Sequence, residues 1–291
     1  MPAAGSPTVW RRRLSAELRR LRGNERGGEV ARAIGWSPTK ISRAESGRDG
    51  IPADEVAKLL GHYGVTGPHH EQLLGLAKEA AQRGWWEDYA DILSPDYMEF
   101  IGLEAGAVSV AQWHSDAMPG LLQTEAYARQ LSQTYQRVVP TTSDRTVDRV
   151  VEVRIKRQER LHTEPALQLS AVIDEAVLLR KIGDRQLMHH QLRHLAETAE
   201  RPNVDLRVLP LNQDSALVMA PFTIISFGPS TISGIASIGD VVSFETLTNE
   251  LLDDETDTQL HRVFFREFTQ SALSPEDSRR LIQSTAESVW S

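Results

Sequence analysis

The segment SPTKISRAESGR, residues 37–48, holds the side chains whose types and spacing best suit a specific chemistry. Ser37 is a residue type that caps helix starts, Pro38 suits the first helical turn, and Gly47 suits the left-handed position after a helix end. This punctuation predicts one short helix from Ser37 to Ser46.

The predicted helix has two different faces. Ile41 and Ala44 are three residues apart and therefore face the same way, which suits packing. Thr39, Lys40 and Arg43 lie off that face and supply hydrogen-bond donors and positive charge. A basic face can release counterions from phosphates, which favours a nucleic-acid partner. The plainer interpretation is a solvated face without a partner.

The charge distribution favours a nucleic-acid contact in the first part of the chain. The whole chain has a net charge of −8, but residues 1–50 contain eleven Lys or Arg and five Asp or Glu, which gives +6. Residues 51–291 therefore carry −14. Phosphates repel an acidic surface, so we expect any nucleic-acid contact to be confined to the basic region.

Amphipathic segments around residues 37–48 predict a helical domain that would hold this segment in place. GNERGG, residues 23–28, is interpreted as a flexible break, and a three-residue turn precedes the basic helix, which gives a helix-turn-helix order. The other predicted helices are Val9–Arg22, Glu29–Ile34, Ala53–Tyr63 and His69–Ala81. We therefore predict an all-α N-terminal helix-turn-helix bundle over residues 1–82.

The core positions of this region resemble a known helix-turn-helix family. The matching residues are Val30-Ala31, Ile34-Gly35, Ser37, Ile41, Glu45 and Gly47. They look like the lambda-repressor and Cro type, also called the xenobiotic-response-element (XRE) type. The resemblance implies a domain that binds double-stranded DNA, and we expect a homodimer because two helices one DNA turn apart multiply specificity.

Carried over by position, the resemblance implies DNA contacts along the basic helix. Ser37 would bind a phosphate at the helix start, and Arg48 would reach the backbone. Thr39, Lys40 and Arg43 would face base edges in the major groove, and the two cations best fit guanine acceptors. The full set of predicted DNA-binding residues is Ser37, Thr39, Lys40, Ser42, Arg43 and Arg48.

The start of the second helix departs from the family pattern. The family usually has a Thr-Gln or Ser-Gln pair there, whose Gln binds a phosphate, whereas this chain has Gly27-Gly28 and a shorter connection. One backbone anchor is therefore missing. We expect reduced DNA affinity or reduced order in this helix as a result.

The region after the bundle, residues 83–291, is predicted to be an α+β domain with a small mixed sheet. Apolar runs at 167–173 and 204–209 are joined by a helical segment, Asp174–Glu200, so these two strands are expected to be parallel. FTIISF and VVSFET suggest a hairpin-like addition. A long helix, Asp144–Leu161, is predicted to have a solvated, ion-paired face that includes Arg149, Lys156, Arg157 and Arg160.

Ordered motifs in this second region resemble the C-terminal domain of a large actinobacterial regulator family. The motifs are WWEDYADILSPDYMEFIGLEAGA, MPGLLQTEAYAR, RIKRQERL, VIDEAVLLR and ALSPEDSRRLI. Members of that family are commonly encoded beside a small partner protein and are discussed as antitoxin-like regulators. The resemblance implies a regulatory or partner-binding domain that senses a small protein or a ligand.

Few residues of the second region suggest catalytic or metal chemistry. His190 and His194 are one helical turn apart and follow His189, but they lack a His-Glu-x-x-His pattern, so surface histidines are the plainer interpretation. Asp174-Glu175 ends a predicted strand, where α/β folds bind ligands, but adjacent acids also suit a helix N-terminus. Glu104 is similarly ambiguous. We expect no catalytic residue, cofactor or metal.

Composition limits the remaining classes of protein. The chain has 291 residues, 40% apolar content and no cysteine, which excludes disulfides and thiolate metal sites. No apolar run approaches the roughly 20 residues that a membrane helix needs, and no apolar core follows Arg11–Arg13 as in a signal peptide. We expect a cytoplasmic protein.

The sequence leaves three functions open. The first is a sequence-specific DNA-binding transcriptional regulator whose second domain senses a partner protein or a ligand. The alternative is a protein-interaction module that sequesters a partner and binds DNA weakly or not at all. An enzyme ranks third, because the sequence contains no recognisable catalytic constellation.

Overall fold

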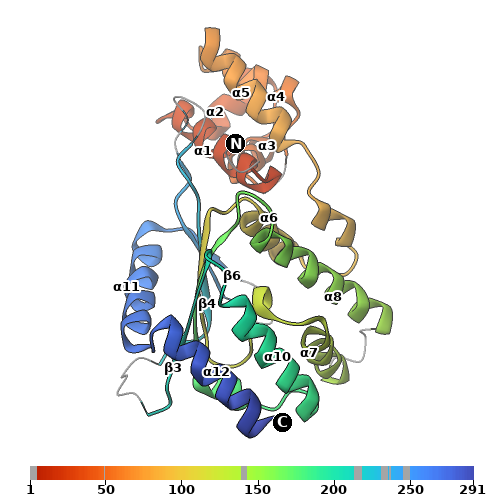
Figure 1. The fold of residues 1–291 in the computed structure, drawn as a ribbon. Helices are drawn as coiled ribbons and strands as arrows, with labels where there is room; N and C mark the ends of the chain where they lie inside the picture. Colours follow the sequence, from red (N-terminus) through yellow and green to blue (C-terminus); the bar gives the residue numbers. More distant parts are fainter. Residues whose placement is uncertain are drawn as a thin grey trace. The chain divides into compact units, whose positions relative to one another are not determined.

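The structure, a computed structural model, describes residues 5–48, 50–138, 143–212, 218–230, 235, 237–244 and 250–291. The chain divides into two compact units (Figure 1). The N-terminal unit comprises Met1–Asp88, Met98–Ala107 and Phe227–Gly239, and the C-terminal unit comprises Tyr89–Tyr97, Val108–Ser226 and Asp240–Ser291. The assignment of separate roles to residues 1–82 and 83–291 stays a prediction.

The N-terminal unit is built from helices, as the sequence predicts. These include α1 (Pro7–Arg22), α2 (Gly27–Ile34), α3 (Pro38–Ser46), α4 (Ala53–His62) and α5 (Gly67–Ala80). Their apolar faces meet in one core, which includes Leu14, Leu18, Val30, Ile41, Leu60 and Leu73. Burying a side chain of this size stabilises the fold by roughly 1.5–3 kcal/mol, so the bundle gives α3 a firm base.

Close backbone contacts attach α6 (Pro95–Ala105) to α1 within this unit. Gly102 approaches α1 so closely that a Cβ atom there would lie 2.0 Å from Thr8 Oγ1. The Ser6 hydroxyl donates a hydrogen bond to the Gly102 carbonyl, and it caps α1 by accepting one from the Thr8 N–H at 3.2 Å. A segment from beyond residue 88 therefore belongs to the helical unit.

The C-terminal unit is built around a mixed sheet. The strands are β1 (Ser109–His114), β2 (Gln168–Asp174), β3 (Val204–Leu209), β4 (Phe222–Ser226), β5 (Val241–Phe244) and β6 (Glu250–Leu252). Within the described residues they form a six-stranded sheet in the order β3-β2-β1-β4-β5-β6. The first three strands are parallel to one another, whereas β4, β5 and β6 extend the sheet in antiparallel fashion. The predicted parallel pair and hairpin-like addition are confirmed, and β6 lies beyond the prediction.

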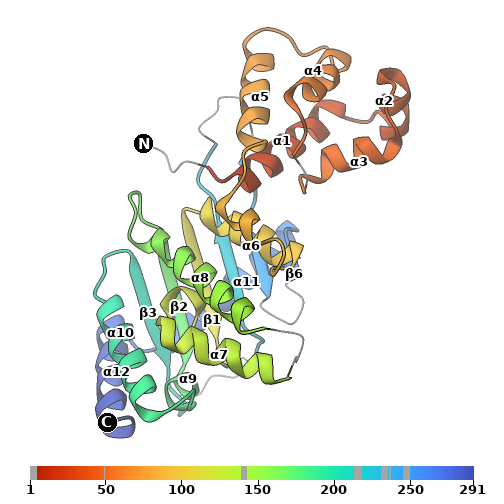
Figure 2. The same cartoon turned by 90° about the vertical axis from the view of Figure 1, so that its right-hand side faces the viewer.

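Helices cover both faces of this sheet (Figures 1 and 2). α11 (Glu255–Ser271) lies on one face, and α7 (Glu125–Val138), α8 (Asp144–Gln158) and α10 (Arg185–Thr198) lie on the other. α12 (Pro275–Val289) packs beside α10 and β3. The predicted fold class is confirmed: a helical N-terminal region is followed by a C-terminal domain with helices and a mixed sheet.

The two faces of the sheet bury different kinds of side chain: an aromatic stack on one face and a hydrogen-bonded polar pair on the other. Facing α11, Trp113 stacks on Phe268 with 4.0 Å between the ring centroids and 7° between the ring planes. Both side chains belong to the apolar core of that face. Side chains alternate along a strand, so Gln112 points the other way, where its Nε2 donates to Thr223 Oγ1 at 3.1 Å. The aromatic stack therefore anchors α11 to β1.

Several predicted helix limits differ from the structure by one to three residues, and two differences change how the sequence is interpreted. α2 begins at Gly27 rather than at Glu29, so residues 23–26 connect the two helices and the two glycines that end GNERGG belong to α2. The helical segment predicted over Asp174–Glu200 is divided into α9 (Glu175–Leu179) and α10. Gly183 lies between them with a φ of 72°, a left-handed conformation that interrupts a helix.

Arg157 contradicts the predicted solvated face of α8. Only 3% of this residue is exposed, and its guanidinium donates to Tyr97 Oη at 2.7 Å. Gly120 lies against the same guanidinium, which a Cβ atom would approach to 3.3 Å. The prediction was wrong because both contacts come from residues distant in sequence, which helical periodicity does not reveal. Arg149 follows the prediction, since it is paired with Asp91.

Replacing Phe268 by Ala should destabilise the C-terminal unit, because it removes the ring that stacks on Trp113 and leaves a cavity. We expect a loss of about 3–5 kcal/mol in the free energy of unfolding, measured by chemical denaturation with circular dichroism. Val263 is exposed on the same helix, so Val263→Ala is the control and should cost less than about 0.5 kcal/mol. Equal losses in the two variants would contradict the anchoring role of the stack.

Candidate nucleic-acid interface

Turns on both sides of α3 fix where this helix begins and ends. Ser37 Oγ accepts a hydrogen bond from the Lys40 N–H at 3.2 Å, which confirms the predicted N-cap. Gly35 precedes the cap and Gly47 follows the helix, with φ of 73° and 71°. A Cβ atom at Gly47 would lie 2.6 Å from Ser15 Oγ, so this position needs glycine for its size as well as its backbone angle.

α3 packs with one face and exposes the other. Ile41 and Ala44 are 2% and 3% exposed and belong to the core of the unit. Lys40 is half-buried. The other predicted DNA-binding residues are exposed, namely Ser37, Thr39, Ser42, Arg43 and Arg48. The structure therefore brings the predicted set together on α3 and its two ends.

An ion pair between α1 and α3 sets the orientation of α3. Arg22 Nε lies 2.6 Å from Glu45 Oε1, and Arg22 Nη2 lies 3.0 Å from Glu45 Oε2, which is a bidentate arrangement. Their side chains are 23% and 12% exposed, so water weakens this pair less than a surface pair. Burial, with the nearby Glu45 carboxylate, raises the pKa of Tyr63 to about 12. The tyrosine therefore stays neutral beside the pair.

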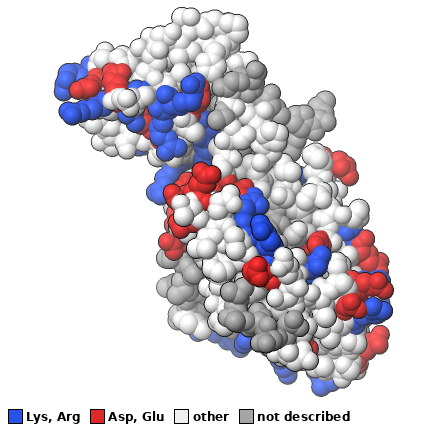
Figure 3. Space-filling model, turned by 90° about the vertical axis from the view of Figure 1, so that its left-hand side faces the viewer, with Lys and Arg blue, Asp and Glu red and all other residues white. Residues whose placement is uncertain are grey.

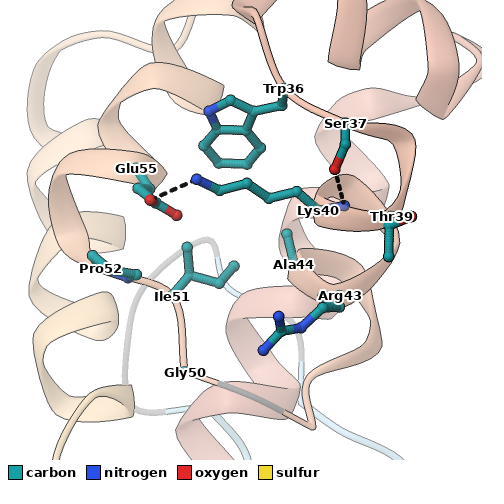
Figure 4. A pocket seen from close by; sticks show the side chains of 10 residues that line it. All are labelled: Trp36, Ser37, Thr39, Lys40, Arg43, Ala44, Gly50, Ile51, Pro52 and Glu55. Carbon is teal, nitrogen blue, oxygen red and sulfur yellow. Dashed lines mark hydrogen bonds and ion pairs between the residues drawn. The ribbon is translucent and has the colours of Figure 1, made fainter.

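Side chains of the N-terminal unit hold the ammonium group of Lys40. Lys40 Nζ lies 2.6 Å from Glu55 Oε1 and 4.3 Å from the centroid of the Trp36 ring (Figure 4). Glu55 belongs to the first turn of α4, and Trp36 precedes the cap of α3. The sequence gives no signal for this contact, because Glu55 is 15 residues from Lys40 and on another helix.

A hollow of about 430 Å³ lies between α3 and the segment that leads into α4 (Figure 4). Ile51 and Pro52 supply its apolar wall. Lys40 and Arg43 from α3 and Glu55 from α4 bring both signs of charge to the same hollow. The exposed face of α3 is therefore bordered by the Glu55 carboxylate, which is not among the predicted DNA-binding residues.

The three consecutive arginines of α1 make contacts inside the N-terminal unit. Arg11 Nε donates to the Ala80 carbonyl at 2.9 Å, and Arg12 Nη2 lies 2.6 Å from Glu99 Oε1. Arg13 is only 6% exposed, and burial lowers the pKa of its guanidinium. The positive charge that a partner can reach is therefore smaller than the sequence count of +6 implies.

Exposed arginines nevertheless remain on the helical unit. Within the described part of residues 1–50 they are Arg19, Arg20, Arg26, Arg32, Arg43 and Arg48. On the face shown in Figure 3, Lys and Arg side chains gather on the N-terminal unit with some acidic side chains between them. Positive charge of this kind suits a phosphate backbone, although the acidic residues reduce the local field.

The first helical residues of α2 lack the glutamine side chain that the resembled family uses to bind a phosphate. Gly27 and Gly28 open the helix, and the Arg26 N–H donates to Glu29 Oε2 at 3.4 Å in a capping arrangement. A local capping contact is thus present at the start of α2. The missing phosphate anchor, by contrast, has no substitute at either glycine.

The candidate residues of the C-terminal unit have structural contacts. Asp174 caps α9 by accepting a hydrogen bond from the Ala176 N–H at 2.8 Å, and Glu175 accepts one from the Leu211 N–H at 2.9 Å. Burial lowers the pKa of His194, which lies on α10 with His189 and His190. In the described ranges, no group of three or more His, Asp or Glu residues could hold a metal ion.

Two family models match the chain. A helix-turn-helix domain model matches residues 13–73, and a model of a domain of unknown function, DUF5753, matches residues 97–284. No curated protein and no solved structure matches the chain significantly. Among the helices of the described residues, none is long and apolar enough to cross a membrane.

Replacing Glu45 by Ala should destabilise the N-terminal unit, because it leaves the partly buried Arg22 guanidinium without its carboxylate. We expect a loss of about 1–3 kcal/mol in the free energy of unfolding, measured by thermal or chemical denaturation. Glu71 on α5 is exposed, so Glu71→Ala is the matched control and should have little effect. An unchanged stability in Glu45→Ala would show that the ion pair does not hold α3.

Proposed function

The chain belongs to the DUF5753 family, and we propose that it is a transcriptional regulator that reads double-stranded DNA with the exposed face of α3. One observation carries this proposal: α3 is capped at both ends, buried on one side and exposed with donor side chains on the other. A helix held in this way is the element that helix-turn-helix proteins place in the major groove.

The contacts proposed for single residues follow from their donor groups. The Arg43 guanidinium suits the O6 and N7 acceptors of guanine, while Thr39 and Ser42 can donate to base edges or phosphates. Ser37 lies at the start of α3, where backbone N–H groups and the helix dipole favour a phosphate. Arg48 follows the helix and is proposed to contact the DNA backbone.

We propose that the regulator acts as a homodimer in the cytoplasm. A dimer would place two copies of α3 about one DNA turn apart, roughly 34 Å, and would bind palindromic sites. Because a dimer binds two half-sites at once, its preference for the specific site is the product of two half-site preferences. This compensates for a helix that offers few base-reading side chains. It also agrees with the resemblance to XRE regulators.

The C-terminal domain is proposed to sense a small partner protein or a ligand, as in antitoxin-like actinobacterial regulators. Its support is the set of sequence motifs that this domain shares with those regulators. The alternative, a module that sequesters a partner and hardly binds DNA, is favoured by the phosphate anchor missing at Gly27-Gly28. The two functions differ in whether DNA binding or partner binding is the stronger interaction.

Purified protein should enrich palindromic sites from genomic DNA fragments, and this binding should weaken steeply as the salt concentration rises. Arg43→Ala should weaken binding to an enriched site by about 1–3 kcal/mol and relax base preference. Arg266→Ala is the control, because it removes one exposed positive charge from α11. Equal weakening by both variants would contradict the assignment of α3 as the DNA-reading helix.

A small protein encoded beside this chain should bind it at micromolar concentration and change its affinity for the enriched DNA. Co-purification followed by a gel-shift titration measures both effects. Failure to associate would remove the partner-sensing role. A stable complex without any DNA enrichment would favour the sequestering function instead.

A further inference from the structure

The contact between Lys40 and Glu55 restrains one of the proposed DNA-binding residues. We propose that Glu55 is a positioning residue that competes with DNA for Lys40, so that their ion pair must open before Lys40 binds a phosphate or a base. This inference rests on the proposed reading of DNA by α3. It adds a residue of α4 that lowers the DNA affinity of the free protein.

The charges explain why the closed pair opposes DNA binding. Lys40 Nζ is 2.6 Å from Glu55 Oε1, so the carboxylate neutralises the ammonium group. A neutralised lysine releases no counterion from DNA, and the Glu55 carboxylate itself repels phosphates at the edge of the interface. Opening the pair supplies DNA with one positive charge.

The contacts of Lys40 are weak enough for DNA to displace them. The side chains of Lys40 and Glu55 are 40% and 24% exposed, and ion pairs in contact with water contribute little free energy. The Trp36 ring, 4.3 Å from Lys40 Nζ, adds a second contact that also binds a cation. The restraint therefore tunes affinity by a modest factor and does not abolish binding.

Substitutions at Arg43 and Asp54 separate the effect of the Lys40–Glu55 pair from other effects of charge on DNA binding. Arg43 lines the same hollow and is a proposed base contact, so it reports on the DNA-reading function itself. Asp54 is exposed, adjoins Glu55 in the first turn of α4, and carries the same charge near the same helix dipole. The ion pair joins Lys40 to Glu55, and Asp54 therefore provides a matched control.

The test measures binding of the full chain to a fluorescein-labelled mixed-sequence DNA duplex over a salt series, by fluorescence anisotropy. Glu55→Gln should bind roughly two- to fivefold more tightly than the unchanged protein, the range expected for losing one partly exposed ion pair. The salt slope should stay close to that of the unchanged protein, because Lys40 binds DNA in both proteins and only the cost of opening the ion pair is removed. Asp54→Asn should give a smaller gain and an unchanged salt slope.

The same substitution in a Lys40→Ala background separates competition for Lys40 from simple loss of negative charge. In this background, the proposal predicts that Glu55→Gln raises DNA affinity no more than Asp54→Asn does. An equal gain with and without Lys40 would overturn the proposal, as would weaker binding by Glu55→Gln, which would show that Glu55 prearranges Lys40 for DNA. Arg43→Ala tests the proposed function separately. If this variant binds DNA as tightly as the unchanged protein, the proposal that α3 reads DNA fails. If Arg43→Ala binds DNA more weakly but Glu55→Gln does not bind it more tightly, only the role of Glu55 is overturned.

Discussion

A helix of nine residues is too short to be stable in water by itself, so α3 depends on the bundle that holds it. Ile41 fixes its depth in the core, and the Arg22–Glu45 pair ties it to α1. The left-handed Gly47 ends it beside Ser15. These restraints fix the orientation of α3 and therefore determine which of its side chains face outward. The proposed function depends on those outward-facing side chains.

The charges of the N-terminal unit are divided between folding and a possible partner. Arg11, Arg12 and Arg22 make contacts within the unit, and Arg13 is buried, whereas Arg43 is exposed on α3. Lys40 lies on the proposed interface and is also paired with Glu55 inside the unit. A count of basic residues therefore overstates the charge available for DNA, and the position of each side chain decides its use.

Much of the fold could be predicted from the sequence, because the information is local. Ser37 and Gly47 mark the ends of α3, and the apolar runs at 167–173 and 204–209 mark two parallel strands. The failures that affect side-chain contacts concern residues far apart in the chain: Tyr97 with Arg157, and Glu55 with Lys40. No helix or strand period encodes such pairs, so the predicted site lacked its acidic border.

Hydrogen–deuterium exchange of the full chain, with and without an enriched DNA fragment, tests the central claim most directly. Because DNA would cover the exposed face of α3, the account predicts slower exchange in peptides that span residues 36–48. Peptides from the sheet of the C-terminal unit should exchange at unchanged rates. Protection confined to the C-terminal unit, with residues 36–48 unaffected, would contradict the assignment of α3 as the DNA-reading helix.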